Sequence, residues 1–141
     1  MSEIGSEIRL SSYKKESIQG DAILVSIYKH FGVETTFSGS TVVLKKVTQS
    51  NNKHLKIDLN KAPDIAQTIA VTSIGLGISC ELLGLHTLKI KETDRLEALQ
   101  KELTKLGAHI SITNNSLYLE SNSILHANIS IETYNDHRMA M

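Results

Sequence analysis

The stretch TDRLEALQKELTKLG, Thr93–Gly107, decides the fold class of this 141-residue chain. Its leucines recur at spacings of three, four and three residues, which predicts an amphipathic helix from about Thr93 to Leu106. Gly107, directly after the last leucine, is typical of a helix end. Glu97 and Lys101 are four positions apart, as in ion pairs along one helix face.

Outward from this helix, short strands alternate with further helices. A Ser38-Gly39-Ser40 turn between two strand-like runs predicts a hairpin, and Pro63 predicts the start of a second apolar helix. The predicted strands are 8–10, 33–37, 41–44, 55–59, 79–85, 108–112, 117–120 and 129–131, and the other predicted helices are 20–31, one from 63 and one from 136. This alternation predicts an α/β (or α+β) fold class.

One supersecondary unit occurs twice along the chain: helix, glycine stop, hairpin, strand, aspartate, helix. Gly32 and Gly107 are 75 positions apart, and Asp64 and Asp136 are 72 apart. A fixed period of this kind is typical of stacked units that share a core. The second copy stops one turn into its last helix, and so short a helix is unstable alone in water. We therefore expect a piece of a longer protein that holds about one and a half units.

Composition argues against several function classes. The 15 Lys+Arg balance the 15 Asp+Glu and only 4% of residues are aromatic, which argues against nucleic-acid binding. No apolar run reaches membrane-spanning length, and a single cysteine, Cys80, excludes a disulfide framework and is typical of a small buried residue. The six histidines lack the spacing of metal ligands. We expect a cytoplasmic protein without metal, cofactor, nucleic-acid or membrane partner.

The first candidate site is Lys91-Glu92-Thr93-Asp94-Arg95, where the helix opens. Cations are disfavoured at the positive end of a helix dipole. Lys91 and Arg95 are therefore better explained if they join the free backbone N–H groups in holding a phosphate or carboxylate. The competing interpretation is a solvated charged surface, in which Glu92 and Asp94 simply suit the dipole.

The second candidate is YNDHRMAM, Tyr134–Met141. Arg138 lies in the first turn of the predicted helix, so two of the three arginines in the chain occupy dipole-opposed positions. A guanidinium group suits bidentate binding of carboxylate or phosphate. Asp136 also fits a plain N-cap, and His137 also fits an ordinary surface histidine.

The third candidate is Asp64, next to Pro63 at a strand–loop–helix junction. An N-cap role is one interpretation. The other is an ionisable carboxylate at a position where sites are often built. Asp64 and Glu92 could then form an acid–base pair whose surroundings separate their proton affinities.

These segments resemble the 5-enolpyruvylshikimate-3-phosphate synthases of the enolpyruvate transferase family, in order over nearly the whole chain. The matching segments are KETDRLEA (91–98), KLGA (105–108), YNDHRMAM (134–141), SIQGD (17–21), Pro63-Asp64 and Thr68-Ile69-Ala70. The resemblance implies an inside-out α/β barrel lobe built from βαββαβ-type units. Residues 1–141 would be part of the C-terminal lobe of such a transferase, with its N-terminal lobe and its last segment absent.

The activity that the resemblance implies is transfer of the enolpyruvyl group of phosphoenolpyruvate to the 5-hydroxyl of shikimate 3-phosphate, with release of phosphate. This is a step toward chorismate and the aromatic amino acids, and it uses no cofactor. By the resemblance, Arg95 and Arg138 bind phosphoenolpyruvate. Glu92 would donate the proton to the methylene carbon, and Asp64 would be the base and would also contact shikimate 3-phosphate.

Other positions receive lesser roles from the resemblance. Lys91 would contact shikimate 3-phosphate, and Thr87 is a candidate contact because it stands where many family members have asparagine. Asp136 and His137 would support the site. Since half of a two-lobed site cannot exclude water or orient two substrates, we expect little or no activity from this chain alone. Its exposed apolar faces favour self-association.

Two alternative functions stay open. The first is enolpyruvyl transfer to a UDP-amino sugar on the same fold. That sister family usually uses a loop cysteine from its N-terminal lobe, to which Cys80 does not correspond. The second is a non-catalytic small-molecule-binding module, which would leave Lys91, Glu92 and Arg95 without a role.

Overall fold

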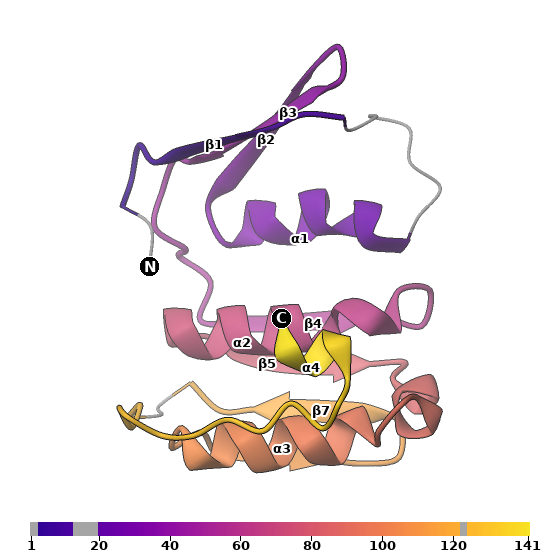
Figure 1. The fold of residues 1–141 in the computed structure, drawn as a ribbon. Helices are drawn as coiled ribbons and strands as arrows, with labels where there is room; N and C mark the ends of the chain where they lie inside the picture. The colour runs from indigo at the N-terminus through magenta and orange to yellow at the C-terminus, as the bar shows by residue number, and fades with distance from the viewer. Residues whose placement is uncertain (1–2, 13–19, 122–123) are drawn as a thin grey trace. The chain divides into compact units, whose positions relative to one another are not determined.

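The computed structural model describes residues 3–12, 20–121 and 124–141, and the chain forms two compact units, 1–52 and 53–141. Each unit combines strands with at least one helix (Figure 1), so the fold class is α/β, as the alternating pattern predicts. Ser17, Ile18 and Gln19, which contribute to the family resemblance, lie outside the described residues.

The described residues of the first unit form a three-stranded antiparallel sheet, a short 3₁₀ helix and an α-helix. The strand order is β1-β3-β2, and the elements are β1 (Glu7–Leu10), η1 (Gly20–Ile23), α1 (Leu24–His30), β2 (Val33–Ser38) and β3 (Thr41–Lys46). Ser38 and Thr41 are register partners, which confirms the predicted hairpin. Gly32 follows the helix at φ +78°, and any Cβ there would collide with the Thr48 carbonyl. Only glycine fits this helix end.

The second unit contains a four-stranded mixed sheet in the order β4-β5-β7-β6. Strands β4 and β5 are parallel, and the other two pairs are antiparallel. The elements are β4 (His54–Asp58), η2 (Pro63–Ile65), α2 (Ala66–Leu76), β5 (Ser79–Leu83), η3 (His86–Ile90), α3 (Arg95–Lys105), β6 (Ile110–Ile112), β7 (Ser116–Leu119) and α4 (His137–Ala140). Helix α2 connects the two parallel strands, as parallel pairing requires a long crossover.

The core of the second unit lies between this sheet and helices α2 and α3. Every second residue of β5 is buried, and in β7 exposed Tyr118 lies between buried Leu117 and Leu119, as expected for strands covered on one face. Three of the four leucines of the α3 stripe are also buried: Leu96, Leu99 and Leu103. Cys80 is buried, as predicted, and burial raises the pKa of its thiol to about 11. Such packing fixes the start of α3, where the first candidate site lies.

The predicted strand at 129–131 is wrong. These residues follow Asn128 at φ +59° and have no regular secondary structure. Their segment instead runs along α3 (Figure 1), and the Glu132 N–H bonds to the Glu102 carboxylate at 3.0 Å. The second copy of the repeat therefore lacks the strand predicted at 129–131.

Candidate functional site

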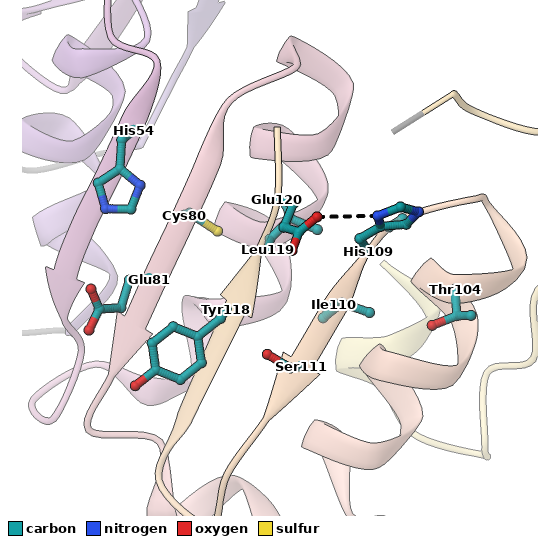
Figure 2. A pocket seen from close by; sticks show the side chains of 11 residues that line it. His54, Cys80, Glu81, Thr104, His109, Ile110, Ser111, Tyr118, Leu119 and Glu120 are labelled. Carbon is teal, nitrogen blue, oxygen red and sulfur yellow. Dashed lines mark hydrogen bonds and ion pairs between the residues drawn. The ribbon is translucent and has the colours of Figure 1, made fainter. Parts of the chain in front are cut away.

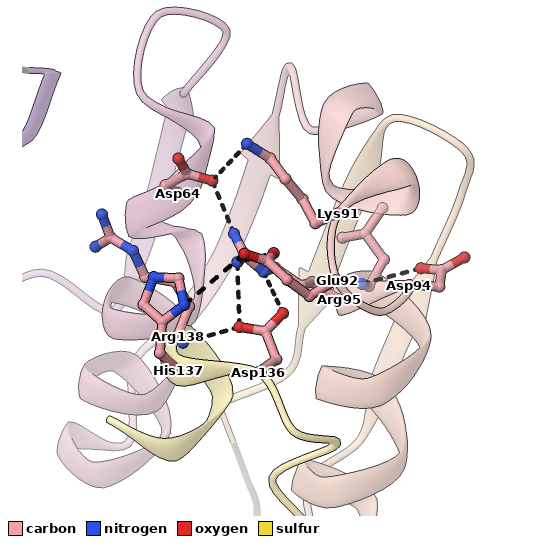
Figure 3. A network of polar contacts seen from close by, with 9 residues as sticks. Asp64, Lys91, Glu92, Asp94, Arg95, Asp136, His137 and Arg138 are labelled. Atoms are coloured by element: carbon pink, nitrogen blue, oxygen red, sulfur yellow. Dashed lines mark hydrogen bonds and ion pairs between the residues drawn. The ribbon is translucent and has the colours of Figure 1, made fainter.

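Arg95, the first residue of α3, is the centre of the candidate site. Its guanidinium makes four hydrogen bonds, all to carboxylates, and the side chain is only 2% exposed. The partners are Asp136 (2.7 and 3.1 Å), Glu92 (2.7 Å) and Asp64 (2.9 Å), as Figure 3 shows. The interpretation of residues 91–95 as a solvated charged surface is therefore wrong for Arg95.

The buried partner of Arg95 is Asp136. This carboxylate caps the short helix α4 by accepting the Arg138 N–H at 2.8 Å, and it also binds two guanidinium nitrogens of Arg95. The predicted N-cap role is confirmed, and the ion pair adds to it. The hydrogen bond from Arg95 is the main reason that the pKa of Asp136 lies below its usual value; burial opposes this shift and the Arg138 N–H assists it.

Asp64 and Lys91 belong to the same network. Asp64 lies in the 3₁₀ turn before α2 and makes no cap bond to that helix, so the plain N-cap interpretation is wrong. Its Oδ1 atom instead binds Arg95 and lies 3.2 Å from the Lys91 Nζ atom. Asp64, Lys91 and Glu92 are 31–49% exposed, so they form an accessible rim above buried Arg95 and Asp136.

The network explains why a cation is stable at this dipole-positive helix start. Burial alone lowers the pKa of Arg95, but the hydrogen bond and charge of Asp136, with the charges of Glu92 and Asp64, raise the pKa above its ordinary value. The anions that stabilise a cation at this helix start are thus the chain's own carboxylates. They come from three segments, just before α2, α3 and α4 (Figure 3).

Three other predicted residues are related to this network less directly. His137 lies beside it, with its Nδ1 atom 3.8 Å from Glu92 Oε1. Arg138 joins through its backbone N–H, while its side chain lines a groove of about 190 Å³ between α2 and α3. Thr87, in η3, has a buried hydroxyl without a hydrogen-bond partner among the described residues. Thr87 therefore makes no hydrogen bond to the Arg95 network in the described part of the chain.

One residue with a clear link to this site escaped sequence reasoning. Glu102, on α3, is only 3% exposed, and its carboxylate accepts the Tyr134 hydroxyl at 2.7 Å. The sequence does carry a signal for Glu102, since this residue lies three positions after Leu99 and seven after Arg95, on the same helix face. An acidic residue within an apolar stripe requires buried partners.

A separate open hollow of about 420 Å³ lies beside β5, β6 and β7 (Figure 2). It contains none of the predicted site residues, and its lining is His54, Cys80, Glu81, Thr104, Ala108, His109, Ile110, Ser111, Tyr118, Leu119 and Glu120. Across the described ranges, no group of three or more His, Cys, Asp or Glu side chains is arranged to hold a metal ion. None of the helices described there is both long and apolar enough to span a bilayer.

Comparison with known proteins gives the family of the chain. A family model described as EPSP synthase (3-phosphoshikimate 1-carboxyvinyltransferase) matches residues 3–141. A 3-phosphoshikimate 1-carboxyvinyltransferase of Clostridioides difficile strain 630 is 36% identical over 139 residues, which are 98% of this chain and 31% of that protein. The protein of the same name from Haemophilus influenzae strain PittGG is 33% identical over 141 residues, with 98% and 32% covered.

A solved structure shares the fold. EPSP synthase from Acinetobacter baumannii aligns with a TM-score of 0.60 and 16% identity, over 97% of this chain and 34% of that one. The chain thus spans about a third of the length of the curated relatives it matches. With the family model matching nearly every residue, the chain belongs to the EPSP synthase family.

Proposed function

We propose that this chain carries the C-terminal-lobe half of an active site for enolpyruvyl transfer. The reaction moves the enolpyruvyl group of phosphoenolpyruvate to the 5-hydroxyl of shikimate 3-phosphate and releases phosphate. The chain's two units would be parts of one lobe, about one and a half of its repeats. Family membership over residues 3–141 supports this assignment, and the carboxylate–guanidinium network supports the position of the site.

One observation carries the proposal. Asp64 and Glu92, the two carboxylates proposed to move protons, both bind the same guanidinium, at 2.9 and 2.7 Å. They come from different segments, 28 positions apart, yet they share one rim with Lys91. A pair of carboxylates held close to a fixed cation is what an addition followed by an elimination requires, because both halves of the reaction move a proton.

In the proposed reaction, the shikimate 5-hydroxyl attacks C2 of phosphoenolpyruvate, Asp64 takes the hydroxyl proton, and Glu92 gives a proton to the methylene carbon. The tetrahedral adduct then loses phosphate and a methyl proton, which restores the enol double bond. Arg95 and Arg138 would hold the anionic groups of phosphoenolpyruvate, and Lys91 those of shikimate 3-phosphate. Thr87 is proposed as a further contact, with Asp136 and His137 as supporting groups.

The geometry indicates how a substrate would enter the network. Asp136 is buried and binds two nitrogens of Arg95, whereas Asp64 and Glu92 are about a third to a half exposed. An incoming carboxylate would therefore replace Asp64 or Glu92 on the guanidinium and leave Asp136 in place. The displaced carboxylate would then be available for proton transfer.

A matched pair of lysine substitutions tests the proposal on the chain itself. Lys91→Met removes the exposed cation that lies beside Asp64. The control, Lys56→Met, removes an exposed cation on β4 that lies 2.9 Å from the Glu81 carboxylate. We expect Lys91→Met to weaken shikimate 3-phosphate binding about tenfold or more, since a charge-assisted bond contributes about 1.5–3 kcal/mol. Isothermal titration calorimetry with each ligand measures this.

Lys56→Met should bind shikimate 3-phosphate as the natural chain does. Equal affinity in both variants, or no binding by the natural chain, contradicts the proposed site.

We further propose that the chain alone releases little or no phosphate, that it works in the cytoplasm with an N-terminal lobe as partner, and that it self-associates when that lobe is absent. Measurable phosphate release by the isolated chain would contradict the first of these statements.

A further inference from the structure

The loop before α4 has a backbone that ordinary residues avoid. Tyr134 and Asn135 have φ values of +57° and +51°, in the left-handed region. Asparagine tolerates this region, but tyrosine rarely adopts it, because its Cβ crowds the following carbonyl. The two residues directly precede Asp136, so their conformation sets where that carboxylate meets Arg95. Something outside the loop must hold it in this shape.

Glu102 is the residue that holds this loop. Its Oε1 atom accepts the Tyr134 hydroxyl at 2.7 Å, and its Oε2 atom accepts the Glu132 N–H at 3.0 Å. Lys105 also donates to both oxygens, at 2.9 and 2.7 Å. These partners leave a carboxylate that is 3% exposed fully hydrogen-bonded.

The position of Glu102 along α3 links it to the site. Arg95 and Glu102 are seven residues apart on one rigid helix, hence on the same face about two turns apart. Helix α3 therefore binds the loop at two points, because Glu102 binds Tyr134 and Arg95 binds Asp136. With two points fixed on one helix, the carboxylate between them has little freedom.

We propose that Glu102 is a positioning residue: through the Tyr134 hydroxyl and the Glu132 N–H, it sets Asp136 against Arg95 and thereby orients the guanidinium that binds phosphoenolpyruvate. Glu102 does not touch the reacting atoms. The orientation of Arg95 follows from the structure alone, while its consequence for phosphoenolpyruvate rests on the function proposed above.

The test uses the intact chain and two readouts. The first is the Arg95 Nε–H signal in ¹H–¹⁵N NMR, whose hydrogen exchange is slowed by the bond to Asp136 Oδ2. The second is phosphoenolpyruvate affinity by calorimetry. Tyr134→Phe removes only the hydroxyl, and Tyr118→Phe, on β7, is its matched control. Glu102→Ala removes the acceptor, and Glu102→Gln keeps an oxygen for the loop without the charge.

We expect Tyr134→Phe and Glu102→Ala to speed Arg95 Nε–H exchange and to weaken phosphoenolpyruvate binding about tenfold. This is the lower end of the effect seen when residues that orient metal ligands are substituted. In Glu102→Gln, most of the slow Arg95 exchange and most of the phosphoenolpyruvate affinity should be kept. Tyr118→Phe should change neither the exchange rate nor the affinity. Unchanged Arg95 exchange in Tyr134→Phe overturns the inference, even if Glu102→Ala fails to fold. Absence of phosphoenolpyruvate binding by the natural chain contradicts the proposed function, while Arg95 exchange still tests the role of Glu102.

Discussion

Asp136→Asn should strongly destabilise the second unit. The substitution keeps the size of the side chain but replaces a carboxylate that is 1% exposed and binds two nitrogens of buried Arg95. Breaking a buried ion pair from one side costs about 3–5 kcal/mol, because the other charge stays desolvated. We expect the lower end, about 3 kcal/mol, since Asp64 and Glu92 still neutralise Arg95.

Urea denaturation, followed by the NMR signals of α3, measures this loss. The matched control is Asp58→Asn, because the Asp58 carboxylate is exposed and accepts the Asn60 N–H at 2.9 Å. Asparagine keeps an oxygen that can accept this bond, so the control substitution should cost about 1 kcal/mol or less. Equal destabilisation by the two substitutions would refute the view that Arg95 and Asp136 form a buried ion pair.

The pH dependence provides a second check on the same prediction. The pKa of Asp136 is lower in the folded chain than its ordinary value, chiefly because of the Arg95 hydrogen bond. Its contribution to stability is therefore present above the unfolded pKa of about 3.9 and is lost as the pH falls through the folded pKa. The difference in unfolding free energy between the natural chain and Asp136→Asn should shrink below about pH 4. A constant difference down to pH 2 would rule out an ionic origin.

Three further predictions concern unfolding free energies measured by urea titration. The hydrogen bond to Glu102 raises the pKa of Tyr134 to about 12, so the natural chain should lose stability between about pH 10, the unfolded value, and pH 12, and Tyr134→Phe should lose less; parallel curves would contradict this. Gly84→Ala should destabilise the chain by more than about 1–2 kcal/mol, because φ is +75° and the new Cβ would lie 2.5 Å from Asn60 N. Gly75→Ala, inside α2, should stabilise the chain by about 0.5–1 kcal/mol, because outside the neighbouring helix backbone the added Cβ would meet no atom within 4 Å. The same sign at both glycines would refute the argument. Leu82→Ala, at a fully buried position of β5, should cost about 2–5 kcal/mol, and a loss under about 1 kcal/mol would show that the core there is loose.

Local patterns predict most of the fold because the chain's turn and cap residues are unambiguous. The α3 leucine stripe, the Gly39-Ser40 turn and the Asp136 cap each give the observed element within a few residues. The strand predicted at 129–131 fails because strand formation also needs a partner. A partner is a tertiary feature, which alternation in the sequence cannot show.

The candidate site is predictable in membership but not in arrangement. Charge at a helix start marks Arg95 as unusual, and the residues around it indicate an anion. Which anion is present depends on how segments tens of residues apart meet, and here Asp64 and Asp136 supply it. Glu102 escapes notice because its partners, Glu132 and Tyr134, lie 30 and 32 positions away.

The Arg95 network also has a consequence for folding kinetics. Its hydrogen bonds close chain loops of 31 and 41 residues, to Asp64 and Asp136. Closing loops of this length costs chain entropy before the new contacts compensate for it. We therefore expect these contacts to form after the α3 helix and the neighbouring β6–β7 hairpin. Substitutions in the network should therefore accelerate unfolding far more than they slow folding. The residues proposed to bind substrate would then set the lifetime of the native state, while having little effect on the folding rate.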